Sequence, residues 1–225
     1  MKNILGIGTA GSNIVQQLSE YPVYKGYCIS NEYSKTSKMD IVYFVPEVEV
    51  LSETKILHER SVRGILQNFA RSGLFEKICL VSNVSLEQVA GSTNVYEYYK
   101  QINHVFTSTY YMLDVFKNTK AITSTFKRPK ESCRITTLGL SSVSGEDRLF
   151  FPFKQEVDVI YYYGINEEKL KTEENLFRTI TNKVKSKITE ERKVSFGIYP
   201  TQYEDDYIYT EYFSPKIQEI NIDTE

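Results

Sequence analysis

Short apolar runs alternate along this chain with longer segments whose apolar residues recur every three or four positions. A short apolar run is typical of a buried strand, and the three-to-four spacing is typical of a helix. Up to residue 118 this pattern predicts strands at 3–8, 27–30, 41–45 and 77–83, and helices at 12–20, 52–72 and 94–118. Such alternation predicts a three-layer α/β domain with a mostly parallel sheet.

The helix at 52–72 carries its apolar residues on one predicted face and has Gly73 as its expected C-cap. That face consists of Ile56, Leu57, Val62, Ile65, Leu66 and Phe69. We expect all six side chains to point toward the core.

After residue 125 the pattern changes. A charged loop at 126–132 is followed by predicted strands at 133–143, 156–165, 193–202 and 207–213, and by a helix at 172–189. This order predicts a second, smaller α+β domain. Because neighbouring strand residues point to opposite faces, at least one of Tyr161, Tyr162 and Tyr163 should face solvent. Asp205 and Asp206 are expected to form a hairpin turn between the last two strands.

Composition places the chain among ordinary globular proteins, with 41% hydrophobic and 25% charged residues in a length of 225. A net charge of −2 argues against a broad nucleic-acid-binding surface. The apolar runs are too short to span a membrane, and the N-terminus enters a glycine turn instead of forming a signal peptide. We therefore expect a cytoplasmic protein without a membrane partner.

Cysteine and histidine usage excludes several kinds of site. Cys28, Cys79 and Cys133 are widely spaced among apolar residues, which predicts reduced and buried thiols. His58 and His104 are the only histidines, and no Cys or His pair has the spacing of a zinc site, so no metal site is expected.

The most informative stretch is ILGIGTAGSNIVQQL at residues 4–18, in which Gly6, Gly8 and Gly11 have the spacing G-x-G-x-x-G. Glycines let the backbone approach a phosphate, and the following helix directs free N–H groups at it. Three hypotheses remain open on this evidence. They are a tight strand–helix turn without a ligand, a mononucleotide site, and a dinucleotide (NAD or FAD) site with Glu32 on the ribose.

The residues around these glycines resemble the first nucleotide loop of the tubulin/FtsZ superfamily, in which a turn of the type G-x-x-G-[SN]-N cradles phosphates. Ser30, Asn31 and Glu32 stand where FtsZ has an Asn-Thr-Asp loop. The segments at 135–149, 158–184 and 194–213 are similar, in order, to the C-terminal domain of that family.

The resemblance implies a tubulin/FtsZ-like fold in a shortened, divergent form. Residues 1–104 would form a reduced nucleotide-binding-like α/β domain, 105–125 the central helix, 126–216 the smaller α+β domain, and 217–225 a polar tail. It implies GTP or GDP as the ligand, with Mg²⁺ only where GTP is bound. The implied nucleotide-binding residues are Gly8, Thr9, Ala10, Gly11, Ser12, Asn13, Asn31, Gly91, Ser92 and Thr93.

Two departures from the family pattern bear on catalysis. The glycine-rich phosphate loop after the fourth strand is replaced by a segment in which Val84, Leu86 and Glu87 would crowd or repel a triphosphate. The loop after the central helix normally carries catalytic acids, yet here Glu131 is its only acid and stands among bases. Lys127, Arg128, Lys130 and Arg134 are those bases, and they form the densest basic patch of the chain.

The resulting functional hypothesis is a protein that assembles head to tail with itself or binds another protein, with GTP hydrolysis weak or lost. Two alternatives remain. One is an active GTPase with a rebuilt site that uses Glu131 as its catalytic acid, and the other is a Rossmann-type enzyme that binds NAD or FAD.

Overall fold

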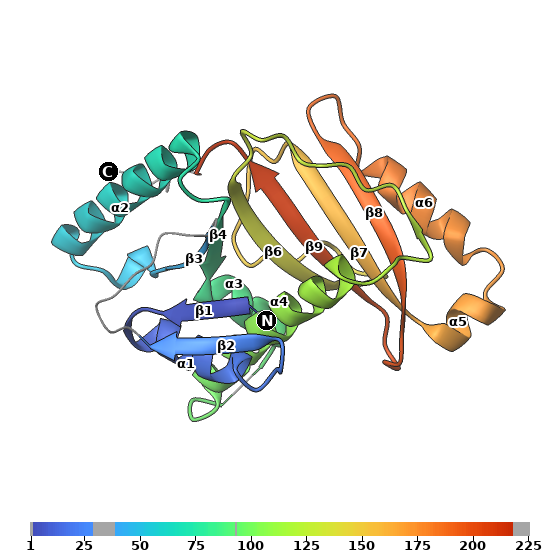
Figure 1. The fold of residues 1–225 in the computed structure, drawn as a ribbon, viewed down its shortest axis with the longest axis horizontal. Coiled ribbons are helices and arrows are strands. Elements are labelled where there is room, and N and C mark those ends of the chain that lie inside the picture. The colour runs from blue at the N-terminus through green and yellow to red at the C-terminus, as the bar shows by residue number, and fades with distance from the viewer. Residues whose placement is uncertain (1, 29–38, 93, 218–225) are drawn as a thin grey trace.

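The computed structural model describes residues 2–28, 39–92 and 94–217. Figure 1 shows the elements as they follow one another along the chain. In order they are β1 (Lys2–Gly6), α1 (Gly8–Leu18), β2 (Tyr24–Cys28), β3 (Asp40–Val45), a 3-10 turn (Val48–Val50), α2 (Glu53–Ser72), β4 (Lys77–Ser82), α3 (Asn83–Ala90), α4 (Tyr98–Lys117), β5 (Thr123–Ser124), β6 (Ile135–Ser142), β7 (Asp158–Asn166), α5 (Glu167–Thr172), α6 (Leu176–Ser186), β8 (Lys193–Thr201) and β9 (Tyr207–Ser214).

Within the described residues, the main sheet has seven strands in the order β3-β4-β6-β9-β7-β8-β5. β3, β4 and β6 are parallel, β9 runs antiparallel to both of its neighbours β6 and β7, and β7 and β8 are parallel. The predicted α/β fold class is confirmed, although the large sheet is mixed. A parallel pair needs a connection that returns the chain to the end of the sheet where the first strand began. The helix α2 provides this connection between β3 and β4.

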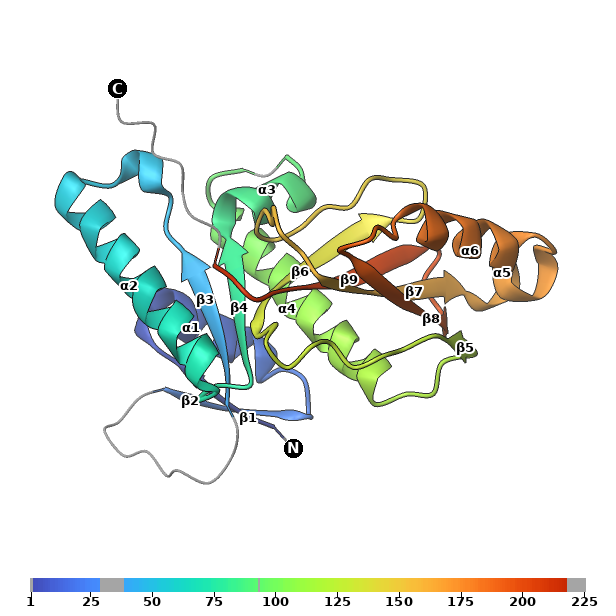
Figure 2. The ribbon, with the colours of Figure 1, turned by 90° about the horizontal axis from the view of Figure 1, so that it is seen from above.

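β1 and β2 form a separate two-stranded parallel sheet. In Figure 2, α3 lies at the carboxyl end of β4, whereas β1 and β2 lie toward the opposite end of that strand. α1 packs tightly on this pair, and the contact leaves no room for a side chain at Gly26. A Cβ there would lie 2.3 Å from the Ser19 hydroxyl and 2.5 Å from a Val15 methyl. The first helix also begins at Gly8, four residues before its predicted start at residue 12, so Gly8 and Gly11 lie within its first turn, whereas Gly6 ends β1.

The apolar side chains of the described ranges form three buried clusters. The largest lies where α1, α3 and α4 cover one face of the main sheet, with Ile102 and Phe106 at its centre. On the other face, α6 covers β7, β8 and β9, and α2 covers β3, β4 and β6. Cys79 and Cys133 are buried free thiols, as predicted, and burial raises the pKa of Cys79 to about 12. In the part of the chain described here, no helix has the length and apolar character needed to cross a membrane.

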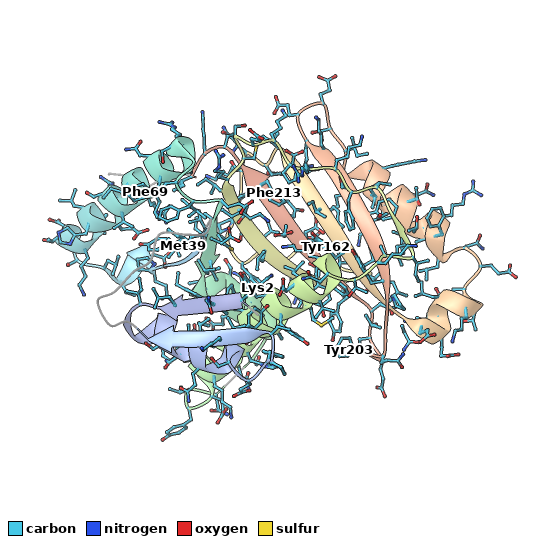
Figure 3. The ribbon with its side chains drawn as sticks, in the orientation of Figure 1. Lys2, Met39, Phe69, Tyr162, Tyr203 and Phe213 are labelled. Carbon is cyan, nitrogen blue, oxygen red and sulfur yellow. The ribbon has the colours of Figure 1, made fainter. Side chains whose placement is uncertain are left out.

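The expectation that a tyrosine of the 161–163 run faces solvent is wrong, because all three side chains are buried. Tyr162 points to the α4 side, where its ring stacks on Phe116, and Figure 3 labels it there. Tyr161 and Tyr163 point to the α6 side. Both faces of β7 are covered by helices, which a strand pattern by itself does not reveal.

Two connections in the C-terminal half also differ from expectation. The predicted helix at 172–189 is the shorter α6, and a separate helix, α5, precedes it. The Asn166 side chain caps α5 by accepting from the backbone N–H groups of Glu168 and Lys169. Asp205 and Asp206 do not form a hairpin turn, since β7 lies between β8 and β9 in the sheet. Asp206 instead accepts from the backbone N–H of Asn166 at 2.8 Å and from Lys169 at 2.7 Å.

α2 is rotated relative to its predicted apolar face. Its inward positions include Glu59 and Arg63, which form an ion pair at 2.8 Å, and Tyr43 donates a hydrogen bond to the same carboxylate. Leu57 and Ile65, expected to be buried, are exposed by 58% and 52%. The C-cap prediction is confirmed: Gly73 has a φ of 71°, a left-handed conformation that favours glycine.

A buried carboxylate joins the two halves of the main sheet. Glu211 on β9 is 3% exposed and accepts from Lys117 of α4 at 2.7 Å, from Tyr162 of β7 at 3.0 Å and from Lys77 of β4 at 3.5 Å. Burial by itself raises the pKa of Glu211, but the two ammonium charges outweigh it and lower the pKa to about 2. The charged form of Glu211 therefore stabilises the folded state.

We predict that Glu211→Gln destabilises the protein by about 3 kcal/mol at pH 7, because two lysines lose a buried partner. The folded pKa lies below the usual carboxyl value of 4.5, so the contribution of Glu211 is present above pH 4.5 and is lost as the pH falls toward 2. Urea unfolding at pH 7 and pH 3 measures the free energy of unfolding of both proteins. The difference in this free energy between Glu211→Gln and wild type should be smaller at pH 3 than at pH 7. A gap of equal size at both pH values would contradict the charge argument; Glu190→Gln, at an exposed position, is the control.

Candidate nucleotide-binding surface

The first turn of α1 has the features of an anion site. Its N-cap, Ile7, is extended with φ of −118° and ψ of 126°, no side chain caps the free N–H groups, and the turn contains no acidic residue. Ala10 and Asn13 are exposed, whereas Gly11 and Ser12 are partly exposed. Uncapped N–H groups and the positive end of the helix dipole favour a bound anion such as phosphate.

Two of the three glycines of this turn are explained by packing. A Cβ on Gly6 would lie 2.5 Å from the carbonyl oxygen of Gly11, and a Cβ on Gly11 would lie 3.2 Å from the carbonyl carbon of Gly6. These glycines therefore let β1 and α1 cross closely. Gly8 and Thr9 are the first two residues of α1. Packing and phosphate binding are compatible roles for such a turn.

α3 stands where the resemblance places a glycine-rich phosphate loop. The helix starts at Asn83, directly after β4. Leu86 is fully buried in the core, and Glu87 accepts a hydrogen bond from Tyr98 at 3.0 Å. Gly91 ends the helix with a φ of 78°, and its backbone N–H donates to Glu87. This positive φ favours glycine at the end of the helix.

The remaining residues that the resemblance assigned are divided between described and undescribed parts of the chain. Gly91 and Ser92 are exposed. Asn31, Glu32 and Thr93 lie outside the described residues.

α4 connects the two segments that carry the candidate residues. Gln17 of α1 accepts a hydrogen bond from Thr107 of α4 at 3.3 Å, and α3 is bonded to the start of α4 through Glu87 and Tyr98. α1 follows a strand of the small sheet and α3 follows a strand of the large one. The structure therefore relates the two segments through the N-terminal half of α4, and not through neighbouring strands of one sheet.

The position of β1 and β2 depends on a polar contact that sequence inspection missed. Asp114 of α4 accepts from Lys2 of β1 and from Tyr24 of β2, the latter at 3.2 Å. Figure 3 labels Lys2 beside α4. Asp114 is buried, although it lies on the side of α4 opposite the apolar repeat of Ile102, Val105 and Thr109. Sequence periodicity therefore places it toward solvent and does not indicate this contact.

Glu131, the candidate catalytic acid, is exposed on the loop that precedes β6. β4 and β6 are parallel and pair Ile78 with Ile135, so this loop lies at the amino end of β4 while α3 begins at its carboxyl end. A strand of six residues separates these ends by about 20 Å. The bases Lys127, Arg128 and Lys130 are exposed on the same loop. Glu131 of one chain therefore cannot act beside the start of its own α3.

No group of three or more His, Cys, Asp or Glu side chains in the described ranges is placed to hold a metal ion. The start of α1 has the features of an anion site. The segment that follows β4 is the helix α3.

No protein-family model matches the chain, and neither does any curated protein. Solved structures do match it. A type III plasmid segregation protein, TubZ, has a TM-score of 0.59 at 13% identity, covering 93% of this chain and 62% of its own. CetZ2 from Haloferax volcanii, in a GTPγS-bound protofilament, has a TM-score of 0.55 at 12% identity, covering 94% of this chain and 64% of its own. An empty FtsZ dimer from M. jannaschii has a TM-score of 0.53 at 10% identity, covering 78% of this chain and 54% of its own.

These likenesses extend over most of the present chain, which spans between about half and two thirds of the length of the matched proteins. At such low identity they establish the fold. The chain therefore has the fold of tubulin and FtsZ, as its sequence resemblance predicted, in a divergent form.

Proposed function

We propose that this protein assembles head to tail into filaments, with a guanine nucleotide bound at the start of α1 promoting the contact and with hydrolysis weak or lost. The observation that carries the proposal is the uncapped, acid-free first turn of α1 within a tubulin/FtsZ-like fold. The proposal keeps residues 1–104 as the nucleotide-facing part, 105–125 as the central helix and 126–216 as the C-terminal part.

The two ends of the main sheet support a head-to-tail arrangement. The exposed basic loop with Lys127, Arg128 and Lys130 lies at the amino end of β4, opposite the end where α3 begins. Stacking such units repeats one heterologous contact and produces an open-ended filament. The basic loop would then face the neighbouring subunit, where it can neutralise phosphate charge. Among the matched structures, CetZ2 is in a protofilament that binds GTPγS.

Two features argue for weak hydrolysis. α3 replaces the loop that would wrap a triphosphate, and its Leu86 is committed to the core. Glu131 is the only acid of the loop at 126–134, where catalysis needs a carboxylate to align the attacking water. Its basic neighbours would compete for that carboxylate. Nucleotide binding without turnover is therefore the favoured chemistry.

We predict that GTP or GDP increases the amount of purified protein pelleted by ultracentrifugation and produces filaments visible by negative-stain electron microscopy. The reason is that bound phosphate would neutralise the end of α1 and attract the basic loop of the next subunit. NAD and FAD serve as competing ligands in a thermal-shift assay. Stabilisation by NAD or FAD with none by GTP or GDP would favour the dinucleotide hypothesis, and the absence of filaments in every condition would refute the assembly proposal.

We predict that Ala10→Glu abolishes nucleotide binding, because a carboxylate in the first turn of α1 occupies the positive end of the helix and repels phosphate. The same change should stabilise the free helix by about 0.5 kcal/mol, so misfolding would not explain the loss. Gln16→Glu is the matched control, because it adds the same charge at an exposed position of the same helix beyond its first turn. Isothermal titration with GTP and GDP measures both variants, and equal binding by Ala10→Glu and wild type would place the nucleotide elsewhere.

The active-GTPase alternative makes the opposite prediction for Glu131, whose exposed position could reach only a neighbouring subunit. We expect slow phosphate release from the wild type and the same rate from Glu131→Ala. A release rate that falls at least tenfold in this variant, with nucleotide binding retained, would establish hydrolysis with Glu131 as the catalytic acid.

A further inference from the structure

Gly64 lies in the middle of α2, and nothing within the described chain explains why it is glycine. A Cβ at this position would meet no neighbour within 4 Å. Its φ is not in the left-handed region, which among the described residues is occupied by Gly73 and Gly91. Glycine is also the least favourable residue for a helix interior apart from proline. A residue of this kind on an exposed helix face lets another backbone approach closely.

Gly64 belongs to an uncharged stripe along the outer face of α2. The stripe residues recur at three-to-four spacing and are all exposed. They are Thr54, Leu57, Ser61, Gly64, Ile65, Asn68 and Ser72. Leu57 and Ile65 supply its apolar surface, whereas the inward face of α2 packs against β3 and β4. Figures 1 and 2 both show α2 at the outer margin of the molecule.

Two charges at the ends of this stripe, Glu53 and Arg71, are complementary to those of a reversed copy, and Arg60 is exposed between them on the same flank. Glu53 is in the first turn of α2 and Arg71 is in the last, and both are exposed. They are separated by 18 positions, which is five helical turns, so they lie on the same flank of the stripe. In the part of the chain described here, neither residue forms an ion pair. Two antiparallel α2 helices related by a twofold axis would bring each Glu53 beside the Arg71 of the other copy.

The same arrangement explains the position of the glycine. The midpoint between residues 53 and 71 is residue 62, so the helices would cross over Ser61 and Gly64, the small residues of the stripe. Small residues at a crossing allow two helices to approach closely. Leu57 and Ile65 would flank the crossing and pack across it. The dipoles of antiparallel helices also oppose one another favourably.

We propose that the outer face of α2 pairs with α2 of a second copy of this chain, in an antiparallel and self-complementary contact. Such a contact is isologous and closes at two copies, unlike open-ended head-to-tail stacking. A single helix pair buries less surface than a standard stable interface, so the dimer is weak and reversible. In a filament, the contact would join neighbouring filaments side by side.

Sedimentation velocity of the full chain without nucleotide, over a range of protein concentrations, tests the proposal. We expect a monomer–dimer equilibrium in the wild type and at least tenfold weaker dimerisation in Gly64→Gln, because the longer side chain separates the helices. Gly64→Gln should melt at a higher temperature than the wild-type monomer, since glutamine favours the helix and meets no neighbour. A wild type that remains monomeric at all concentrations, or a Gly64→Gln variant that dimerises normally, would overturn the proposal.

A charge exchange tests the antiparallel orientation. Glu53→Arg and Arg71→Glu should each weaken self-association, because like charges then meet at both ends of the pair. An equimolar mixture of the two variants should recover dimers, because each arginine then faces a glutamate. Lys55→Glu, an exposed charge change away from the stripe, is the control and should leave dimerisation unchanged. A mixture that stays monomeric would exclude this pairing.

Failure of this proposal is separable from failure of the filament proposal. Ala10→Glu should block nucleotide-dependent filaments and leave the nucleotide-free dimer intact. Gly64→Gln should block the dimer and leave single filaments, which electron microscopy distinguishes from paired ones.

Discussion

The carboxylate of Glu211 is the contact on which the relative placement of the two halves of this protein depends. It lies on β9, in the C-terminal half, yet its partners come from β4, α4 and β7. β4 and β6 share only two register pairs, Ile78 with Ile135 and Cys79 with Thr136. Few backbone contacts therefore connect these two strands. Because Glu211 cannot be left unpaired in a buried setting, it fixes where the end of α4 and the start of β4 lie.

α4 is the second element that positions the parts of this protein. Its polar contacts hold β1, β2, α1 and α3, which include the candidate site. Asp114, near its end, holds Lys2 and Tyr24, and so orients the small sheet of β1 and β2. Thr107 contacts α1, and Tyr98 contacts α3. The position of the α1 N-terminus therefore depends on polar contacts along one helix. The sequence pattern had predicted a mostly parallel sheet, but β1 and β2 form a separate sheet.

The chemistry of the candidate surface follows from this arrangement. The start of α1 remains free of caps and acids, while the segment after β4 has become a helix whose Leu86 belongs to the core. Under the proposed function, such a surface would hold an anion between subunits without cleaving it. The two proposed contacts of the chain then differ in kind, one open-ended and dependent on nucleotide, the other closed and formed by α2.

The sequence by itself determined the fold class, most of the elements and the C-cap at Gly73, because periodicity and glycine placement are local properties of the chain. It did not determine the rotation of α2, where Glu59 and Arg63 face inward and Leu57 faces outward. It also did not reveal that helices cover both faces of the strand with Tyr161, Tyr162 and Tyr163. Only the tertiary structure decided these features, because burial and the pairing of charges depend on residues that are far apart in the sequence.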